Sequence, residues 1–119
     1  MKKILVLSGG RSEFGILDGV CRAIAAREEL ELSLAVTGVH LLPEYGSTVE
    51  QARASGIPVR FEIPFYAAQP IEDAELPASI ARGVAGIDGA LQEAGADLVL
   101  VLGDRPEAMA AALAGYARG

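Results

Sequence analysis

The sequence predicts an α/β fold in which helices cover both faces of a parallel sheet. Short apolar runs at 3–8, 30–37, 59–63 and 98–102 indicate strands, and the stretches between them carry mostly helical signals. Strands that alternate with helices are typical of a parallel, right-handed, doubly wound sheet. With 119 residues, 51% of them hydrophobic and 22% charged, the chain has the size and composition of one globular domain or part of one.

The first strand and helix follow one another directly. Residues 3–8 form a β-branched and leucine-rich run that two glycines end. A helix is then expected from about Glu13 to Arg27, with Ser12 or Glu13 placed to cap its start. Its apolar residues fall on one stripe, which consists of Ile16, Leu17, Val20, Cys21 and Ile24.

Two further strands are predicted in the middle of the chain. Leu30–Thr37 begins with alternation and ends apolar, and Val59–Ile63 is bracketed by prolines. Between them, Ser47 or Thr48 is placed to cap a short helix that runs through Ala54.

A long loop and a glycine-rich helix are expected next. Residues 64–77 have neither a helical nor a strand period, and loops of this length are usually functional or mobile. The helix that follows ends at Gly95, and its apolar residues Ile80, Val84, Ile87 and Leu91 repeat at helical spacing. Gly83, Gly86 and Gly89 lie on one side of it and weaken it by about 1 kcal/mol each where exposed. Either they let another backbone approach, such as that of a partner subunit, or the local packing is loose.

The stretch LVLVLGDRPE, at 98–107, holds the last strand, a tight break and the start of a helix. Because Leu98–Leu102 is apolar without alternation, we expect a central strand covered on both faces. Gly103 ends the strand. Pro106 suits the first turn of a helix that runs on through MAAALAGYA.

A strand order of 3-2-1-4 would bring the turns at 9–15 and 103–107 to the two sides of one crevice. Open α/β sheets bind ligands there, at the carboxyl ends of their strands. The first turn fits neither common nucleotide fingerprint. It has no glycine pair spaced for G-x-G-x-x-G, and although Gly10 and Gly15 are spaced as in a phosphate loop, Ile16 stands where the lysine must be.

Two arginines and one carboxylate are expected at that crevice. Arg11, beside a helix N-terminus, suits a phosphate or pyrophosphate, or else it is a solvated turn residue paired with Glu13. Asp104 can transfer a proton, bind a hydroxyl or merely cap the following helix. Arg105 keeps Asp104 ionised and adds a second cation. These groups together predict an anionic sugar or nucleotide as the ligand.

His40, in the loop after the second strand, is the only histidine, and Cys21 is the only cysteine. From these two residues no zinc site and no Cys/His nucleophilic pair can be assembled, so no metal is predicted. We interpret His40 as structural or ligand-orienting ahead of catalytic, and count it among the candidates for substrate binding. Tyr45 and Ser47 share its loop.

Charge and cysteine content bear on partners and compartment. A net charge of −6 and a pI near 4.7 argue against nucleic acid or an anionic membrane as a partner. With one cysteine no intrachain disulfide forms, which favours a reducing, cytoplasmic setting. The opening MKKILVLSGG lacks a cleavage site and reads as a strand rather than a signal peptide, and no apolar run approaches the ~20 residues that span a bilayer.

Three segments together resemble the hydrolysing UDP-N-acetylglucosamine 2-epimerases: GGRSEFGIL, VTGVHLLPEYGSTVEQ and DLVLVLGDRPEAMAAALAG. The resemblance is to the N-terminal domain of that family and spans nearly the whole chain. It implies a Rossmann-like doubly wound sheet that is the N-terminal half of a glycosyltransferase-B type fold, in which two such domains face each other across a cleft. Residues 1–119 would be that N-terminal domain in incomplete form, without the second domain.

The resemblance also implies roles for single residues. Arg11 matches the arginine near the nucleotide phosphates, Asp104 the first catalytic acid, and Arg105 a neighbour that contacts substrate. Gly15 matches a small residue of the first turn. Glu13 and Phe14 depart from the acidic–tyrosine pair that is commoner in the family, and their roles stay open.

The implied reaction takes the proton from C2 of UDP-N-acetylglucosamine and expels UDP from C1, leaving a glycal to which water adds with inversion at C2. It supplies manno-configured sugars for sialic-acid-type biosynthesis and uses no cofactor. The chemistry needs carboxylates as acid and base and cations for the leaving diphosphate. One carboxylate cannot serve both faces of the sugar, so we expect the 119 residues alone to be inactive.

Several alternatives stay open. The sequence GDR followed by PE favours the hydrolysing branch, but a non-hydrolysing epimerase shares the architecture. A noncatalytic module that binds a nucleotide or a partner subunit is the third hypothesis. The substrate is either UDP-N-acetylglucosamine itself or a relative such as a diacetamido-trideoxy sugar, and the resemblance implies a homodimer for the full-length form.

Overall fold

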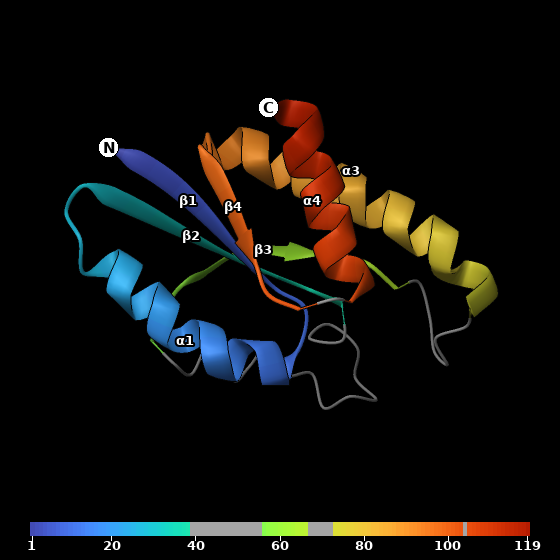
Figure 1. Ribbon diagram of the computed structural model, residues 1–119, viewed down its shortest axis with the longest axis horizontal. Helices are drawn as coiled ribbons and strands as arrows, with labels where there is room; N and C mark the ends of the chain where they lie inside the picture. The colour runs from blue at the N-terminus through green and yellow to red at the C-terminus, as the bar shows by residue number, and fades with distance from the viewer. Residues whose placement is uncertain (39–55, 67–72, 104) are drawn as a thin grey trace.

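The computed structural model describes residues 1–38, 56–66, 73–103 and 105–119, with the backbone alone at 11–13 and at 73. In these residues four strands form one parallel sheet in the order β3-β2-β1-β4, as the sequence predicts (Figure 1). The strands are β1 (Lys2–Ser8), β2 (Leu30–Thr37), β3 (Val59–Ile63) and β4 (Leu98–Val101). The helices are α1 (Arg11–Ala25), the 3-10 turn η3 (Asp73–Glu75), α3 (Leu76–Ala94) and α4 (Pro106–Arg118). The short helix predicted through Ala54 lies outside the described residues.

Helices cover the two faces of the sheet, so the predicted α/β, doubly wound architecture is confirmed. In Figure 1, α1 lies on one face and α3 and α4 lie on the other. Along β1 the side chains alternate between two cores, because successive residues of a strand point to opposite faces. Leu5 and Leu7 are buried with residues of α3 and α4, while Val6 is buried with residues of α1.

Helix α1 begins earlier than predicted, and its cap differs. The N-cap is Gly10, which is extended at φ −173° and makes no side-chain cap hydrogen bond. The buried Ser8 hydroxyl donates to the Gly10 carbonyl at 3.2 Å, and the Phe14 N–H donates to the same carbonyl at 3.0 Å. The helical hydrogen bonds therefore start at Gly10, and the prediction that Ser12 or Glu13 caps the helix is wrong.

Strand β4 is not central in the described sheet. It pairs with β1 on one side and lies at the edge, where Leu98 is 52% exposed. Its side chains still contact both cores, Val99 on the side of α3 and α4 and Leu100 on the side of α1. The prediction that both faces of this strand are covered is therefore confirmed, and among the described strands β4 pairs with β1 alone.

The glycines of α3 admit side chains from β3 and the residues after it. The helix begins at Leu76, within the stretch expected to be a loop. A Cβ on Gly83 would lie 2.3 Å from the Phe65 ring, and one on Gly86 would lie 2.6 Å from Cγ2 of Ile63. A Cβ on Gly89 would have no atom of the described part of the chain within 4 Å. At Gly83 and Gly86 the absence of a side chain is thus required by close packing against Phe65 and Ile63. Neither loose packing nor the approach of another backbone explains these two glycines.

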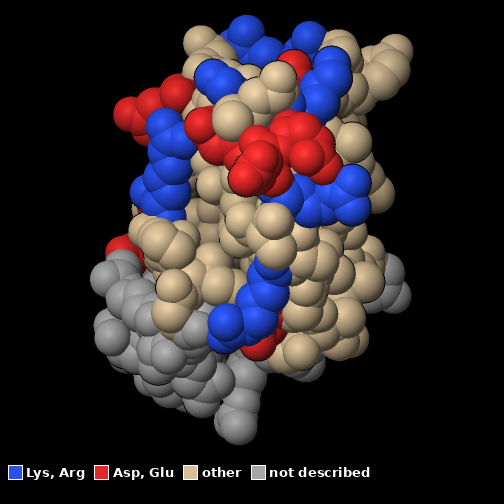
Figure 2. All heavy atoms as spheres, turned by 90° about the vertical axis from the view of Figure 1, so that its left-hand side faces the viewer, with Lys and Arg blue, Asp and Glu red and all other residues tan. Residues whose placement is uncertain are grey.

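The amino ends of the strands form a charged end of the molecule. Figure 2 shows Lys and Arg side chains interleaved with Asp and Glu over the upper part of one face, near the N-terminus. Arg27 Nε donates to Glu29 at 2.6 Å there, and the Lys3 N–H donates to Asp97 at 2.9 Å. The interleaving of both signs is typical of a solvated surface. Among the helices that the structure describes, none has the length and apolar character to cross a membrane.

Candidate functional site

Three chain segments converge at the carboxyl edge of the sheet. Because β1 is parallel to both β2 and β4, the turns that follow these strands meet at the same edge. Gly38, directly after β2, has a φ of +63°. A Cβ there would lie 2.8 Å from the Gly9 carbonyl oxygen and 2.9 Å from Oε1 of Glu107. The end of β1, the end of β2 and the start of α4 are therefore packed closely around one glycine.

The carboxylate of Glu107 is the buried charge at this point. The residue lies in the first turn of α4 and is only 2% exposed. The Tyr66 hydroxyl donates to its Oε1 at 2.5 Å, and Arg105 Nε donates to its Oε2 at 3.0 Å. Each carboxylate oxygen thus has a donor, which offsets the cost of burying the charge. We call these three side chains the Tyr66–Glu107–Arg105 cluster.

The cluster favours one set of protonation states. Burial, together with the hydrogen bond to Glu107 and its negative charge, raises the pKa of Tyr66 to about 12, against a smaller opposing effect of Arg105. The hydrogen bond to Glu107 and its charge likewise raise the pKa of Arg105, which burial opposes. Near neutral pH, Tyr66 is therefore a neutral O–H donor and Arg105 is a cation.

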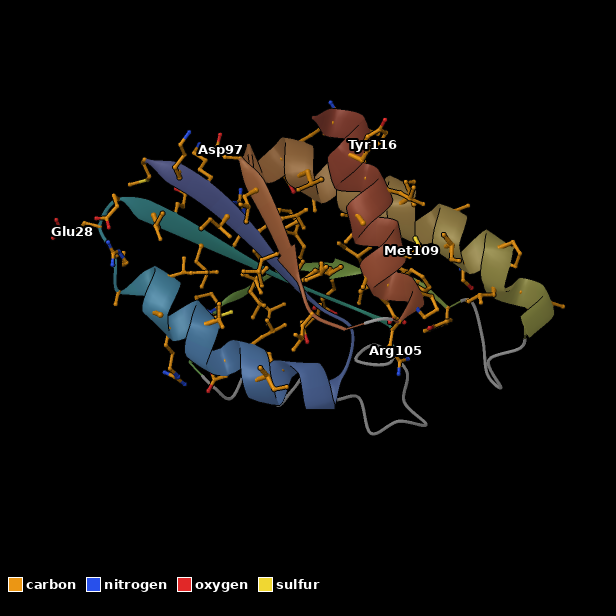
Figure 3. The ribbon with its side chains drawn as sticks, in the orientation of Figure 1. Glu28, Asp97, Arg105, Met109 and Tyr116 are labelled. Carbon is orange, nitrogen blue, oxygen red and sulfur yellow. The ribbon has the colours of Figure 1, made fainter. Side chains whose placement is uncertain are left out.

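Arg105 is the most exposed member of the cluster. It occupies the N-cap position of α4, with an extended ψ of 163° and no side-chain cap hydrogen bond, and its side chain is 43% exposed. Figure 3 shows it at the beginning of α4, at the opposite end of the sheet from Glu28 and Asp97. A guanidinium here can contact a ligand that binds over the carboxyl ends of the strands.

Tyr66 is anchored by the residues next to it. Phe65 is 1% exposed and fills the space over Gly83, and Arg82 Nη1 donates to the Phe65 carbonyl at 2.5 Å. The Phe65 and Tyr66 rings meet edge to face, with centroids 4.9 Å apart and an interplanar angle of 68°. The segment after β3 is thus fixed against α3, and this holds the Tyr66 hydroxyl on Glu107.

The structure places the predicted site residues to different extents. Arg105 lies at the carboxyl edge as expected. Arg11 is the first residue of α1, directly after the β1 turn, but its side chain is not among those described. Gly15 lies inside α1 rather than in the turn, and a Cβ on it would meet no atom of the described residues within 4 Å. Asp104 and His40 lie outside the described residues.

Sequence reasoning missed Tyr66 and Glu107. An acidic residue in the first turn of a helix is common for electrostatic reasons alone, so Glu107 did not stand out. Its place two residues after Arg105 was the signal that could have found it. Tyr66 follows β3 in a stretch without periodicity, and nothing local pointed to its partner. Within the described residues, no group of three or more His, Cys, Asp or Glu side chains could hold a metal ion.

The sequence matches a known family over most of its length. Residues 22–119 match the family described as UDP-N-acetylglucosamine 2-epimerase. The UDP-N,N'-diacetylbacillosamine 2-epimerase (hydrolyzing) of Legionella pneumophila is 32% identical over 114 residues, which make up 96% of this chain and 30% of the relative. The UDP-N-acetylglucosamine 2-epimerase of Neisseria meningitidis is 30% identical over 115 residues, 97% of this chain and 29% of the relative. The chain therefore spans about 30% of the length of these relatives.

A solved structure shows the same fold. The UDP-GlcNAc 2-epimerase from Neisseria meningitidis, bound to UDP-GlcNAc, matches with a TM-score of 0.78 and 19% identity, over 98% of this chain and 30% of that one. At this identity the likeness bears on the fold, which is the Rossmann-like α/β half of a glycosyltransferase-B type arrangement, as predicted. Taken with the match over residues 22–119, it follows that the chain belongs to the UDP-N-acetylglucosamine 2-epimerase family and represents an N-terminal portion of it.

Proposed function

We propose that this chain is the N-terminal part of a hydrolysing UDP-N-acetylglucosamine 2-epimerase. The full-length enzyme would convert UDP-N-acetylglucosamine, or a related UDP-2-acetamido sugar, and water to UDP and the free manno-configured sugar. The observation that carries this proposal is the place of Arg105, a cation held by the buried Glu107 at the same sheet edge as the N-terminus of α1.

The two features suit a diphosphate. The first N–H groups of a helix have no partner within the helix and lie at the positive end of its dipole, so they favour a bound phosphate. Arg105 adds a full positive charge, and Arg11 at the first position of α1 adds a second. Positive groups fixed in place stabilise the negative charge that builds up on UDP as it leaves C1.

The acid and base come in part from this chain. We assign to Asp104, directly before Arg105, the role of a proton-transfer group at C2 of the sugar. A glycal forms when UDP departs, and water then adds to it with inversion at C2. Because one carboxylate cannot serve both faces of the sugar, the remaining acid and base groups belong to the rest of the protein. According to this proposal, residues 1–119 form an incomplete N-terminal domain, and activity requires the second domain as well. We expect the full-length protein to be a cytoplasmic homodimer.

The hydrolysing branch is favoured by the GDRPE turn and by the Legionella relative, whose name states hydrolysis. The non-hydrolysing reaction, in which the product stays attached to UDP, is the alternative within the family. The Neisseria relative, whose name does not specify hydrolysis, is similar to this chain to almost the same degree.

The product of the full-length protein tests the proposal. Purified enzyme is incubated with UDP-N-acetylglucosamine, UDP release is followed by a coupled assay, and the sugar is identified by NMR. Free UDP with a free 2-acetamido sugar supports the hydrolysing reaction, whereas a UDP-linked manno sugar assigns the alternative. If the native protein ends at Gly119 and binds UDP in calorimetry without turnover, the chain is a noncatalytic nucleotide-binding module.

A further inference from the structure

We propose that Glu107 is a positioning residue: with Tyr66 it fixes the orientation of the Arg105 guanidinium for a nucleotide diphosphate. This inference rests on the proposed function and deepens it, because it names the side chains that hold the diphosphate-binding cation in place. Neither residue needs to touch the sugar itself.

The favourable interaction of a carboxylate with the N-terminus of α4 does not explain why Glu107 is buried. A carboxylate that only complements the N-terminus of α4 would act equally well from an exposed position. Glu107 is instead 2% exposed and packed against Gly38, where even a methyl group would lie 2.9 Å from Oε1. A charge in such a place is costly unless it is paired. The hydrogen bonds from Arg105 and Tyr66 therefore make it possible for Glu107 to be buried as a charged carboxylate.

The contact to Arg105 is made through Nε, at 3.0 Å from Oε2 of Glu107. A hydrogen bond at Nε fixes the plane of the guanidinium, because the bonds around its central carbon are conjugated and planar. Arg105 also hydrogen-bonds the side chain of Tyr66. The planar set of N–H donors in a guanidinium is what suits it to bidentate contact with phosphate oxygens. With its side chain 43% exposed, Arg105 is both oriented by the protein and accessible to a ligand.

Tyr66 belongs to the same cluster but comes from a different part of the chain, the segment after β3. Its hydroxyl occupies Oε1 of Glu107 at 2.5 Å and leaves Oε2 to Arg105. The segment that carries it is held by the Phe65 ring over Gly83 and by Arg82 on the Phe65 carbonyl. The position of the Arg105 guanidinium is thus set by contacts that reach back to α3 and to the end of β3.

A loss of positioning should appear in substrate binding. Arg105 would contact the diphosphate both in the enzyme–substrate complex and in the transition state. An interaction of equal strength in both states raises KM with little change in kcat when it is lost. A purely structural role of Glu107 would lower stability without moving KM.

The experiment uses the full-length enzyme in four variants: Glu107→Gln, Tyr66→Phe, Arg105→Ala and the Arg105→Ala/Glu107→Gln double variant. We expect Glu107→Gln to raise KM for UDP-N-acetylglucosamine about tenfold with kcat within about threefold, and to raise the Kd for UDP by the same factor. Tyr66→Phe keeps the ring on Phe65 and should raise KM about threefold. If Glu107 acts through Arg105, the double variant has the same KM as Arg105→Ala alone.

A matched control is available on the same helix. Arg118, at the other end of α4, pairs with the partly exposed Asp88 through its own Nε. Asp88→Asn removes that pairing far from the carboxyl edge and should leave KM, kcat and the Kd for UDP unchanged.

Three results would overturn the proposal. A wild-type KM in Glu107→Gln alongside lowered thermal stability would make Glu107 a packing residue only. Additive effects in the double variant would show that it does not act through Arg105. If Glu107→Gln does not fold, an unchanged KM in the folded Tyr66→Phe variant would likewise overturn the positioning role. Should the unmodified enzyme fail to turn over the sugar, the proposed function fails, while UDP calorimetry on the same variants still decides the role of Glu107.

Discussion

The Phe65 ring occupies the space where a side chain on Gly83 would stand. A Cβ at position 83 would lie 2.3 Å from Cε2 and 2.5 Å from Cδ2 of that ring, which is itself 1% exposed. This contact holds Phe65, the residue before Tyr66, against the middle of α3. Gly83 therefore helps to position Tyr66 at the carboxyl edge of the sheet.

Gly83→Ala should therefore destabilise the fold although alanine favours helices. We expect a loss of about 1–3 kcal/mol in the free energy of unfolding, because the ring must move out of a packed core. Gly89→Ala on the same helix is the control: none of the residues that the structure describes has an atom within 4 Å of its Cβ position, so we expect a gain of about 0.5–1 kcal/mol. Urea denaturation followed by circular dichroism measures both, and equal gains would contradict the packing of Phe65.

Gly38→Ala should lower the stability of the fold more than a glycine substitution that introduces backbone strain without steric overlap. Its φ of +63° disfavours any side chain, and its Cβ would also press on the Gly9 carbonyl oxygen and on Glu107. We expect a loss of at least about 2 kcal/mol. Gly56→Ala, at φ +86° with no atom of the described residues within 4 Å of its Cβ position, isolates the strain and should cost about 1 kcal/mol. A difference near zero between the two in thermal denaturation would mean that the close contacts relax freely.

The stability of the fold should depend on Tyr66 in alkaline solution. Because the pKa of Tyr66 is raised from 10.0 to about 12, the folded state favours the neutral phenol. Its contribution is fully present below pH 10 and is lost as the pH rises through about 12. In urea denaturation across this range, the free energy of unfolding of Tyr66→Phe should fall less steeply than that of the wild type. Tyr116→Phe, at a residue that is 88% exposed, should follow the wild type, and parallel curves for all three proteins would contradict the raised pKa.

The thiol of Cys21 should resist modification in the native state. It is 0% exposed on the inner face of α1, and burial, with a smaller effect of the Asp18 charge, raises its pKa to about 11. Thiolate is the reactive form, so little of it is present at pH 8. A dithiobisnitrobenzoate assay should show slow labelling of native protein and rapid labelling in 6 M guanidinium chloride, on the order of a hundredfold faster. Rapid labelling without denaturant would place this thiol at the surface.

The proposed role of Asp104 predicts a kinetic effect. Asp104→Asn in the full-length enzyme removes the proton-transfer group and keeps nearly the same shape. We expect UDP release to fall by about 10²–10⁴-fold, with an unchanged circular dichroism spectrum. Near-normal turnover in this variant would reduce Asp104 to a structural residue of the turn. Glu93→Gln, on the outer side of α3, is the control and should retain full activity.

The sequence determined the architecture because its signals are local. Apolar runs predicted strands such as Leu30–Thr37 and Val59–Ile63, whose observed bounds agree. The strand order 3-2-1-4, on which the predicted crevice depends, is confirmed by the structure. Pro106 likewise marked the start of α4 by the properties of a single residue.

Only the tertiary structure decided which turn residues meet and which side chains support them. Gly15 belongs to α1 because the helical hydrogen bonds begin at Gly10, and that start follows from how β1 ends. Tyr66 and Glu107 are 41 residues apart, and no period or spacing relates them. They meet because parallel strands deliver their carboxyl ends to one edge and because Gly83 leaves room for Phe65. Burial of a carboxylate with two donors depends on that three-dimensional convergence, so no local pattern in the chain encodes it.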